Sequence, residues 1–303
     1  MGDTNAIRPG RGYLLAVLNM LISGVAIYVN GYGVKLFDDS TLYTALKNLF
    51  VGVILSALLL APSRVGQRVR LRPSQWLLLL CVAVIGGSVP YALYFRGLQL
   101  STPVMGSLVN HAQFLLVGAL AAVFLKERLG AGLWIALGVL VVGLTLGISV
   151  SAVRFDAGVI YLVAGTVLFA ASFVLMKHLL ASVPPRIVMA FKMGLGSVLL
   201  MGYVAATGHI AAIAALSPLQ WGVVAGTGLI LLAFTVTSVY ALRHASATAV
   251  TAVPAGAPIV TTLLTVASTG ATVSTTRWLG LVLVLAALVA ILVLGPRREL
   301  AQA

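Results

Sequence analysis

Negative charge is scarce in this chain. Only 8% of the 303 residues are charged, whereas about a quarter of the residues in soluble domains are. The six acidic residues all fall near the termini or between long apolar runs: Asp3, Asp38, Asp39, Glu127, Asp156 and Glu299. No carboxylate pair is therefore expected at mid-membrane depth, which argues against an Asp/Glu proton relay and an aspartyl intramembrane protease. There is also no H-E-x-x-H motif and no P-loop, so neither a zinc protease nor a self-contained ATP-driven pump is expected.

Cysteine is nearly absent as well. The single Cys81 lies in an apolar run, so no disulfide can form within the chain, and a buried hydrophobic role is expected. The net charge is +13, but the basic residues lie between apolar runs and no soluble basic domain is present. Nucleic acid is therefore not expected as a partner. The sequence also indicates no catalytic residue, no metal site and no cofactor.

Long apolar runs are what the chain has in abundance. It is 61% hydrophobic with a mean hydropathy of +1.11. Each run is about 20–25 residues long and continuous, which suits a helix crossing a hydrocarbon core of about 30 Å rather than a barrel strand. The sequence therefore predicts an all-α integral membrane protein with ten transmembrane helices. The predicted spans are 12–36, 43–61, 74–96, 102–125, 131–150, 156–180, 186–206, 217–242, 247–269 and 275–295.

Lysine and arginine are unevenly divided among the breaks between these spans. If the N-terminus lies in the cytoplasm, 14 of the 19 basic residues fall at cytoplasmic ends. The remaining five are Lys35, Lys47, Arg96, Arg154 and Arg277. Because basic residues are enriched on the cytoplasmic side of membrane proteins, both termini are predicted to be cytoplasmic.

The chain contains a weak internal repeat. The segment 130–143 resembles 273–286, with Trp134 and Trp278 separated by 144 residues. Two pairs of lysines have nearly the same separation: Lys47 with Lys192, and Lys35 with Lys177. Together these matches predict a first five-helix repeat at 1–150 and a second at 151–303. Five is an odd number of crossings, so the second repeat is inverted in the membrane, a plan common among transporters.

These features resemble the drug/metabolite transporter superfamily, in its ten-helix branch of paired EamA-type repeats. The resemblance rests on two segments: "FLKERLGAGLWIALGVLVVGL" at the end of the first half and "WLGLVLVLAALV" at the end of the second. Glu127 matches the acidic residue that usually follows the fourth helix, whereas "STGATVSTTRWLG" has no glutamate there. Within the superfamily the chain is most similar to bacterial aromatic amino-acid exporters. The resemblance implies a carrier of the bacterial inner membrane that exports amino acids and other small amphipathic molecules.

The fourth predicted span has an unusual polar centre, "NHAQ". His111 lies roughly 13 Å into the span at a rise of about 1.5 Å per residue, which is close to the membrane midplane. Ser107, Asn110 and His111 share one helical face, and Gln113 lies beside them. Such groups either line a water-filled cavity or bond neighbouring helices together, and the clustering favours a cavity. His111 is also the only deep group expected to titrate near neutral pH, so proton coupling would run through it.

Other spans supply further candidates for substrate binding. By the repeat, "PAGAP" of the ninth span is equivalent to "NHAQ", and its two prolines interrupt the helix. The carbonyls freed there can face a ligand ammonium, although a simple packing kink fits equally well. The remaining candidates are hydroxyl groups on three spans, the first, the third and the eighth. The full set of predicted binding residues is Ser23, Tyr28, Tyr91, Tyr94, Ser107, Asn110, His111, Gln113, Thr235, Ser238, Pro254 and Pro258.

Lys47 and Lys192 lie a few residues inside their predicted spans. Long lysine side chains near helix ends usually reach back to the membrane interface, and this is the expectation for both. A phosphate-binding pair is the alternative, but inverted repeats place the two lysines at opposite membrane faces. With no charge expected at depth, the predicted cargo carries no net charge, as a zwitterion does.

The sequence therefore predicts a secondary transporter and not an enzyme. Its expected cargo is a small organic solute, most favourably an aromatic amino acid, bound at the midplane between the repeats. Nucleotide sugars, organic cations and other metabolites or drugs are alternative cargoes. An intramembrane enzyme using His111 would need a nucleophile or an acidic partner, and a passive pore would need rings of polar residues. The expected partners are the small-molecule substrate and the lipid bilayer, and the oligomeric state stays open, with a monomer allowed.

Overall fold

The computed structural model describes residues 9–60, 70–146 and 155–302. Every regular element in those ranges is helical, as predicted. The first half contains α1 (Pro9–Gly33), α2 (Ser40–Leu60), α3 (Pro73–Gly87), α4 (Val89–Leu100), α5 (Pro103–His111), α6 (Gln113–Phe124) and α7 (Ala131–Thr145). The second half contains α8 (Ala157–Leu180), α9 (Pro185–Ala190), α10 (Gly196–Ala206), α11 (Pro218–His244), α12 (Ala247–Ala252), α13 (Ala257–Thr269) and α14 (Thr275–Gln302). Short helical turns join some of them: η1 (Val34–Leu36), η3 (Phe191–Leu195), η4 (His209–Ala215) and η5 (Val253–Gly256).

Side-chain caps and prolines explain where several helices begin. Ser217 accepts a hydrogen bond from the Gln220 N–H, and the Gln220 side chain bonds back to the Ser217 N–H, which is a capping box. Thr102 caps α5 and Asp156 caps α8 by accepting from the backbone N–H groups of Met105 and Val159. Because proline fits the first turn of a helix, the starts of these membrane helices are set by local sequence.

The ten predicted spans are present, but four of them are not single α-helices. The third breaks at Ser88, between α3 and α4, and the fourth breaks at Ala112, between α5 and α6. The seventh contains the π-helical turn η3, and the ninth contains the 3₁₀ turn η5. Nine spans in the described ranges are long and apolar enough to cross a membrane. The fifth, α7, is shorter, and its predicted continuation to residue 150 lies outside the described residues.

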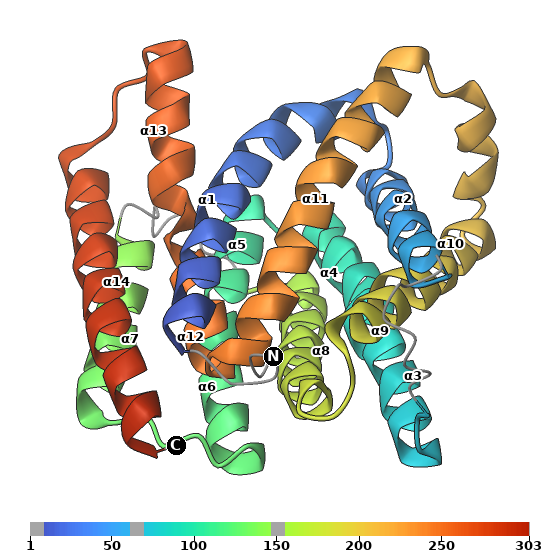
Figure 1. The fold of residues 1–303 in the computed structure, drawn as a ribbon. Helices are drawn as coiled ribbons and strands as arrows, with labels where there is room; N and C mark the ends of the chain where they lie inside the picture. The colour runs from blue at the N-terminus through green and yellow to red at the C-terminus, as the bar shows by residue number, and fades with distance from the viewer. Residues whose placement is uncertain (1–8, 61–69, 147–154, 303) are drawn as a thin grey trace.

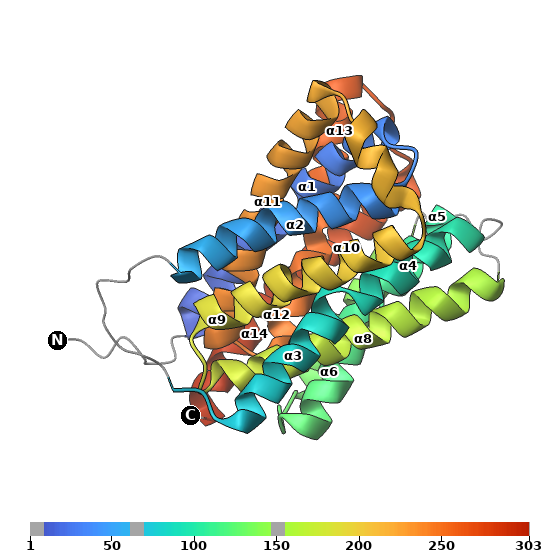
Figure 2. The same cartoon turned by 90° about the vertical axis from the view of Figure 1, so that its right-hand side faces the viewer.

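Helix packing repeats between the two halves of the chain. The first span, α1, packs against the eighth, α11, while their counterparts five spans away, α8 and α4, also pack together (Figure 1, Figure 2). Likewise α2 packs against α11, and α3 packs against η3 of the seventh span. The fifth and tenth spans, α7 and α14, lie side by side as counterparts (Figure 1). The contacts therefore exchange when each span is replaced by its counterpart, as a two-fold repeat requires. The predicted boundary at 150/151 lies outside the described residues and stays a prediction.

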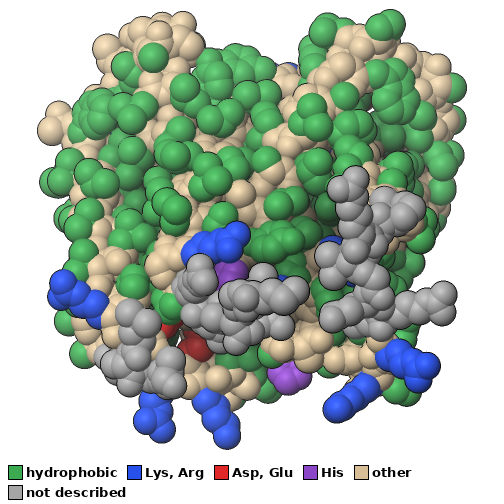
Figure 3. Space-filling model, viewed as in Figure 1, with side chains coloured by type: hydrophobic (Ala, Val, Ile, Leu, Met, Phe, Trp, Pro, Cys, Tyr) green, Lys and Arg blue, Asp and Glu red, His purple; other side chains and the backbone are tan. Residues whose placement is uncertain are grey.

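The outer surface of the bundle is apolar. Leu14, Val53 and Ile160 each expose 60% or more of their surface, which a lipid environment tolerates and water does not. The start of α1 and the end of α14 lie at the same end of the molecule, where the Tyr13 hydroxyl donates to the Glu299 carboxylate at 2.9 Å. Lys and Arg side chains gather along that edge in the view of Figure 3. This agrees with an even number of crossings and with a basic side that carries the start of α1 and the end of α14.

Candidate functional site

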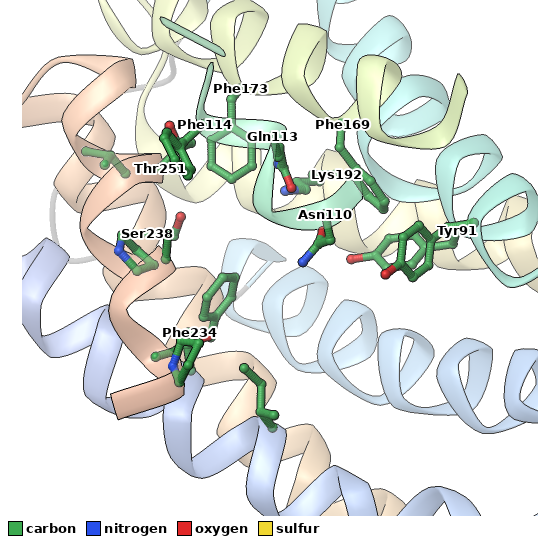
Figure 4. Close-up of a pocket in the computed structure, with 18 of the residues that line it drawn as sticks. Tyr91, Asn110, Gln113, Phe114, Phe169, Phe173, Lys192, Phe234, Ser238 and Thr251 are labelled. Carbon is green, nitrogen blue, oxygen red and sulfur yellow. The ribbon is translucent and has the colours of Figure 1, made fainter. Parts of the chain in front are cut away.

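A cavity of about 360 Å³ lies between the two halves of the chain. Its walls come from the first, third and fourth spans and from their counterparts, the sixth, eighth and ninth, with a single residue from the seventh. The cavity therefore lies where the two repeats meet. Figure 4 shows polar and aromatic side chains from these helices directed into one space.

Eight of the twelve predicted binding residues line this cavity. They are Ser23, Tyr91, Tyr94, Asn110, Gln113, Ser238, Pro254 and Pro258. Asn110 is exposed and Gln113 partly exposed at the cavity wall. The Tyr91 ring meets the Phe169 ring edge-on, with centroids 4.9 Å apart. The Tyr94 hydroxyl donates to the Gly106 carbonyl at 3.0 Å, so this tyrosine also ties α4 to α5.

The "NHAQ" and "PAGAP" segments both interrupt their helices beside the cavity. Asn110 and Gln113 flank the break at Ala112. Pro254 lies within the η5 turn, and Pro258 follows it at the start of α13. The ninth span breaks because proline has no N–H to donate and its ring clashes with the preceding turn. The fourth span breaks at the equivalent place without a proline. Matched interruptions in the fourth helix of each half are typical of the discontinuous helices that form transporter binding sites.

The remaining predicted residues are placed elsewhere. The Tyr28 hydroxyl donates to Ser268 Oγ at 2.7 Å, and the Tyr28 ring packs on Tyr32 rather than on the cavity. Thr235 is buried at 5% exposure and Ser107 is exposed, and neither lines the cavity. These three residues are not brought to the cavity, because a shared helical face does not fix which neighbour that face meets, and their role in cargo binding stays a prediction. The side chain of His111 lies outside the described part of the structure, so its predicted role stays untested.

Phenylalanine residues form a large part of the cavity wall, and none of them is among the binding residues predicted from the sequence. Phe169 and Phe173 come from α8, and Phe234 comes from α11. Phe114, which shares the face of Asn110, adds a fourth ring and is 2% exposed. The i, i+4 spacing from Asn110 places Phe114 on the polar face of the fourth span. The other three rings carry no such signal, because phenylalanine in an apolar run looks the same whether it faces the core, lipid or a cavity.

The Lys192 side chain lies in a different place from the one expected from the sequence. It lines the cavity, and its Nζ lies 5.3 Å from the centroid of the Phe173 ring. The expectations that this lysine reaches the interface and that no charge lies at depth are therefore wrong. The π-helical turn η3 carries Lys192, and such turns are often found at functional sites. Gly87 allows this segment to approach closely, because a Cβ there would meet the Lys192 carbonyl and lie 2.7 Å from the Gly196 Cα.

Lys47, the counterpart of Lys192, is arranged differently. Its Nζ donates to Asn30 Oδ1 at 2.8 Å and lies 4.6 Å from the centroid of the Tyr43 ring. Tyr43 also donates to Asn30 Oδ1 at 2.6 Å. Lys47 is therefore held in a network of its own, and it does not line the cavity.

Charged groups from α8, from α14 and from the segment between α6 and α7 bind the α11–α12 corner, residues 242–248. Lys177 Nζ donates to the carbonyls of Leu242 and Ala245 at 2.8 and 2.7 Å. Glu127 accepts from the Ala247 N–H at 2.7 Å, at the start of α12, where a helix N-terminus favours negative charge. The ninth span first lines the cavity at Val250, just after this corner. These bonds therefore hold together the end of the bundle next to the cavity.

Glu299 completes this fastening from α14. Its carboxylate accepts from the Ser246 N–H and from the Tyr13 hydroxyl, both at 2.9 Å. Glu127 also accepts from the Thr248 hydroxyl at 2.9 Å. Two of the six acidic residues thus serve as caps for one corner of the bundle. Glu127, the glutamate after the fourth span, therefore has a structural role, and its presence needs no role in cargo binding to explain it.

A helical membrane bundle of two packed repeats around a central cavity is the architecture of many small-molecule carriers. The profile of the EamA-like transporter family matches this chain twice, at residues 10–149 and 156–293. The protein belongs to the EamA-like transporter family, whose members are membrane transporters of small solutes. A solved structure titled only "Crystal structure of protein" is similar in fold, with a TM-score of 0.72 at 18% identity. That match covers 92% of this chain and 97% of the other. No curated protein matches.

Proposed function

We propose that this protein is a secondary transporter that carries small organic solutes by alternating access, with amino acids as its cargo and aromatic ones favoured. The observation that carries the proposal is the central cavity, because three of the five counterpart pairs of spans contribute both members to its wall: the first with the sixth, the third with the eighth and the fourth with the ninth. Rocking of one repeat against the other would expose such a site to each side in turn.

The cavity chemistry supports an aromatic amino acid. Phe114, Phe169, Phe173 and Phe234 offer apolar faces for a side-chain ring, and ring pairs are favourable beyond simple burial. Asn110 and Gln113 supply amide donors and acceptors at the break of the fourth span. A volume of about 360 Å³ lies within the usual range of small-molecule sites, about 300–1,000 Å³.

The cellular setting is part of the same proposal. The basic end of the bundle, which carries the first residues of α1 and the last of α14, faces the cytoplasm of a bacterial inner membrane. Net export is the direction implied by the resemblance to aromatic amino-acid exporters. Cysteine accessibility at Asp39 and Gly270, expected outside, and at Ala301, expected inside, tests this orientation.

Counterflow in proteoliposomes with labelled phenylalanine, tryptophan, leucine and glutamate tests the function. We expect exchange of phenylalanine and tryptophan to exceed that of glutamate. Asn110→Ala and Gln113→Ala should reduce exchange while changing the free energy of unfolding by less than about 0.6 kcal/mol, the average worth of an interhelical hydrogen bond. Lost stability with unchanged exchange per folded molecule would instead make "NHAQ" a packing element. Exchange of none of the four amino acids would refute the proposed cargo.

A further inference from the structure

The cavity contains a cation that the described protein leaves without an anionic partner. No Asp or Glu lines the cavity. In residues 9–60, 70–146 and 155–302, the contact found for the Lys192 ammonium is the face of Phe173. Glu127 and Glu299 are committed to the α11–α12 corner. Asp39 and Asp156 accept from backbone N–H groups at the starts of α2 and α8. Lys192 therefore differs from Lys47 and Lys177, whose ammonium groups donate to protein oxygens.

An ionisable group within a membrane bundle is costly unless it meets a partner, and it marks a substrate or ion path by default. Lys192 is also held in place by its surroundings. The side chain passes Gly86, whose Cβ, if present, would lie 3.6 Å from Lys192 Cε. Its backbone is fixed by the close approach of Gly87 to Gly196. The position is thus determined by the fold, and what the ammonium lacks is an anion.

We propose that Lys192 binds the carboxylate of the cargo, so that the substrate class is small carboxylic acids with an aromatic or apolar body. This proposal rests on the proposed function and names the group by which the cargo is recognised. A single lysine matches one negative charge. A phosphate monoester carries about 1.5 to 2 negative charges at neutral pH, which one ammonium does not neutralise, and no arginine lines the cavity.

The rest of the wall fits such a cargo. Figure 4 shows Lys192, Gln113 and Asn110 directed toward one side of the cavity, with Phe173 and Phe169 nearby. The amide groups can donate to the second carboxylate oxygen or accept from a cargo ammonium or hydroxyl. The rings receive the apolar body. An ammonium on the cargo is therefore tolerated but not required, and a cargo that is only a cation meets Lys192 as a like charge.

Three probes of matched shape separate these requirements. L-Phenylalanine has both charged groups, 3-phenylpropanoate has only the carboxylate, and phenethylamine has only the ammonium. Binding to the purified full-length protein is measured by calorimetry, and counterflow is measured in proteoliposomes. We expect the two carboxylates to bind and phenethylamine to bind at least tenfold more weakly. Lys192→Gln should weaken binding of both carboxylates at least tenfold and should strengthen binding of phenethylamine, because the like charge is removed. Lys192→Arg should retain the preference for acids.

Lys47→Gln is the matched control, since it removes the counterpart lysine and should leave the ratio of acid to amine affinity unchanged. Lys192→Gln that binds 3-phenylpropanoate as wild type does would overturn the proposal, as would wild-type protein that prefers phenethylamine or binds no acid. Failure of the proposed function looks different. In that case the acids bind in a Lys192-dependent way, but no counterflow occurs. A fold defect is recognised by lost phenethylamine binding together with a lowered melting temperature.

Discussion

Lys47 and Lys192 occupy equivalent positions in the two repeats, yet they have opposite surroundings. Lys47 lies in a regular helix, α2, and donates to Asn30. Lys192 lies in the π-helical turn η3 and faces the cavity with an aromatic ring as its contact. A duplicated fold therefore supplied two similar lysines. Local backbone geometry gives Lys47 a bonded, structural role and leaves Lys192 able to contact a cargo.

The largest expected loss of stability comes from replacing Lys177, whose ammonium group, like that of Lys47, donates to protein oxygens. Lys177→Met removes two hydrogen bonds from the α11–α12 corner. At about 1.5 kcal/mol for each bond to a charged group, the free energy of unfolding should fall by about 3 kcal/mol. Its counterpart Lys35 is exposed at the end of the first span, so Lys35→Met should stay within about 0.5 kcal/mol of wild type. Denaturation in detergent measures both, and equal losses would show that the corner is not fastened by Lys177.

The next effect sets the two central lysines directly against each other. Lys47→Met should lower the free energy of unfolding by about 2 kcal/mol, because it removes a charge-assisted hydrogen bond to Asn30. Lys192→Met should leave stability unchanged or raise it, because it relieves a cation that has no acceptor in the described ranges. Melting curves of the two variants test this difference. A larger loss for Lys192→Met would mean that this lysine is structural after all.

A smaller effect concerns the backbone that presents Lys192. Gly87→Ala would place a Cβ against the Lys192 carbonyl and 2.7 Å from Gly196 Cα, which should cost about 1–3 kcal/mol by overpacking. Cargo affinity should fall as well, because η3 is displaced. Gly202→Ala, on α10 with open space around it, should instead stabilise by about 0.5–1 kcal/mol. If Gly87→Ala kept both stability and affinity, close packing against η3 would not position Lys192.

Composition and repeats predicted the membrane class, the ten spans and the "NHAQ" face of the cavity, because apolar length and buried polar groups are written directly in the sequence. The break at Ala112 was not predictable, since no proline or glycine marks it. The position of Lys192 was not predictable either. Whether a lysine near a helix end reaches the interface or a cavity depends on which way its face is turned. Here that is set by the η3 turn and by two glycines from helices far apart in the sequence.

The two lysines differ in role only if the cavity is the place where cargo binds while crossing the membrane. Asn110→Cys in a Cys81→Ala background places a single reactive thiol on its wall, since Cys81 is the sole native cysteine. Labelling in proteoliposomes with a membrane-impermeant thiol reagent, added to each side separately and with or without L-phenylalanine, reads access and occupancy together. If the cavity opens to each side in turn, we expect the thiol at position 110 to be labelled from both sides, and more slowly when L-phenylalanine is present. Labelling from one side only, at a rate that L-phenylalanine does not change, would contradict alternating access through this cavity.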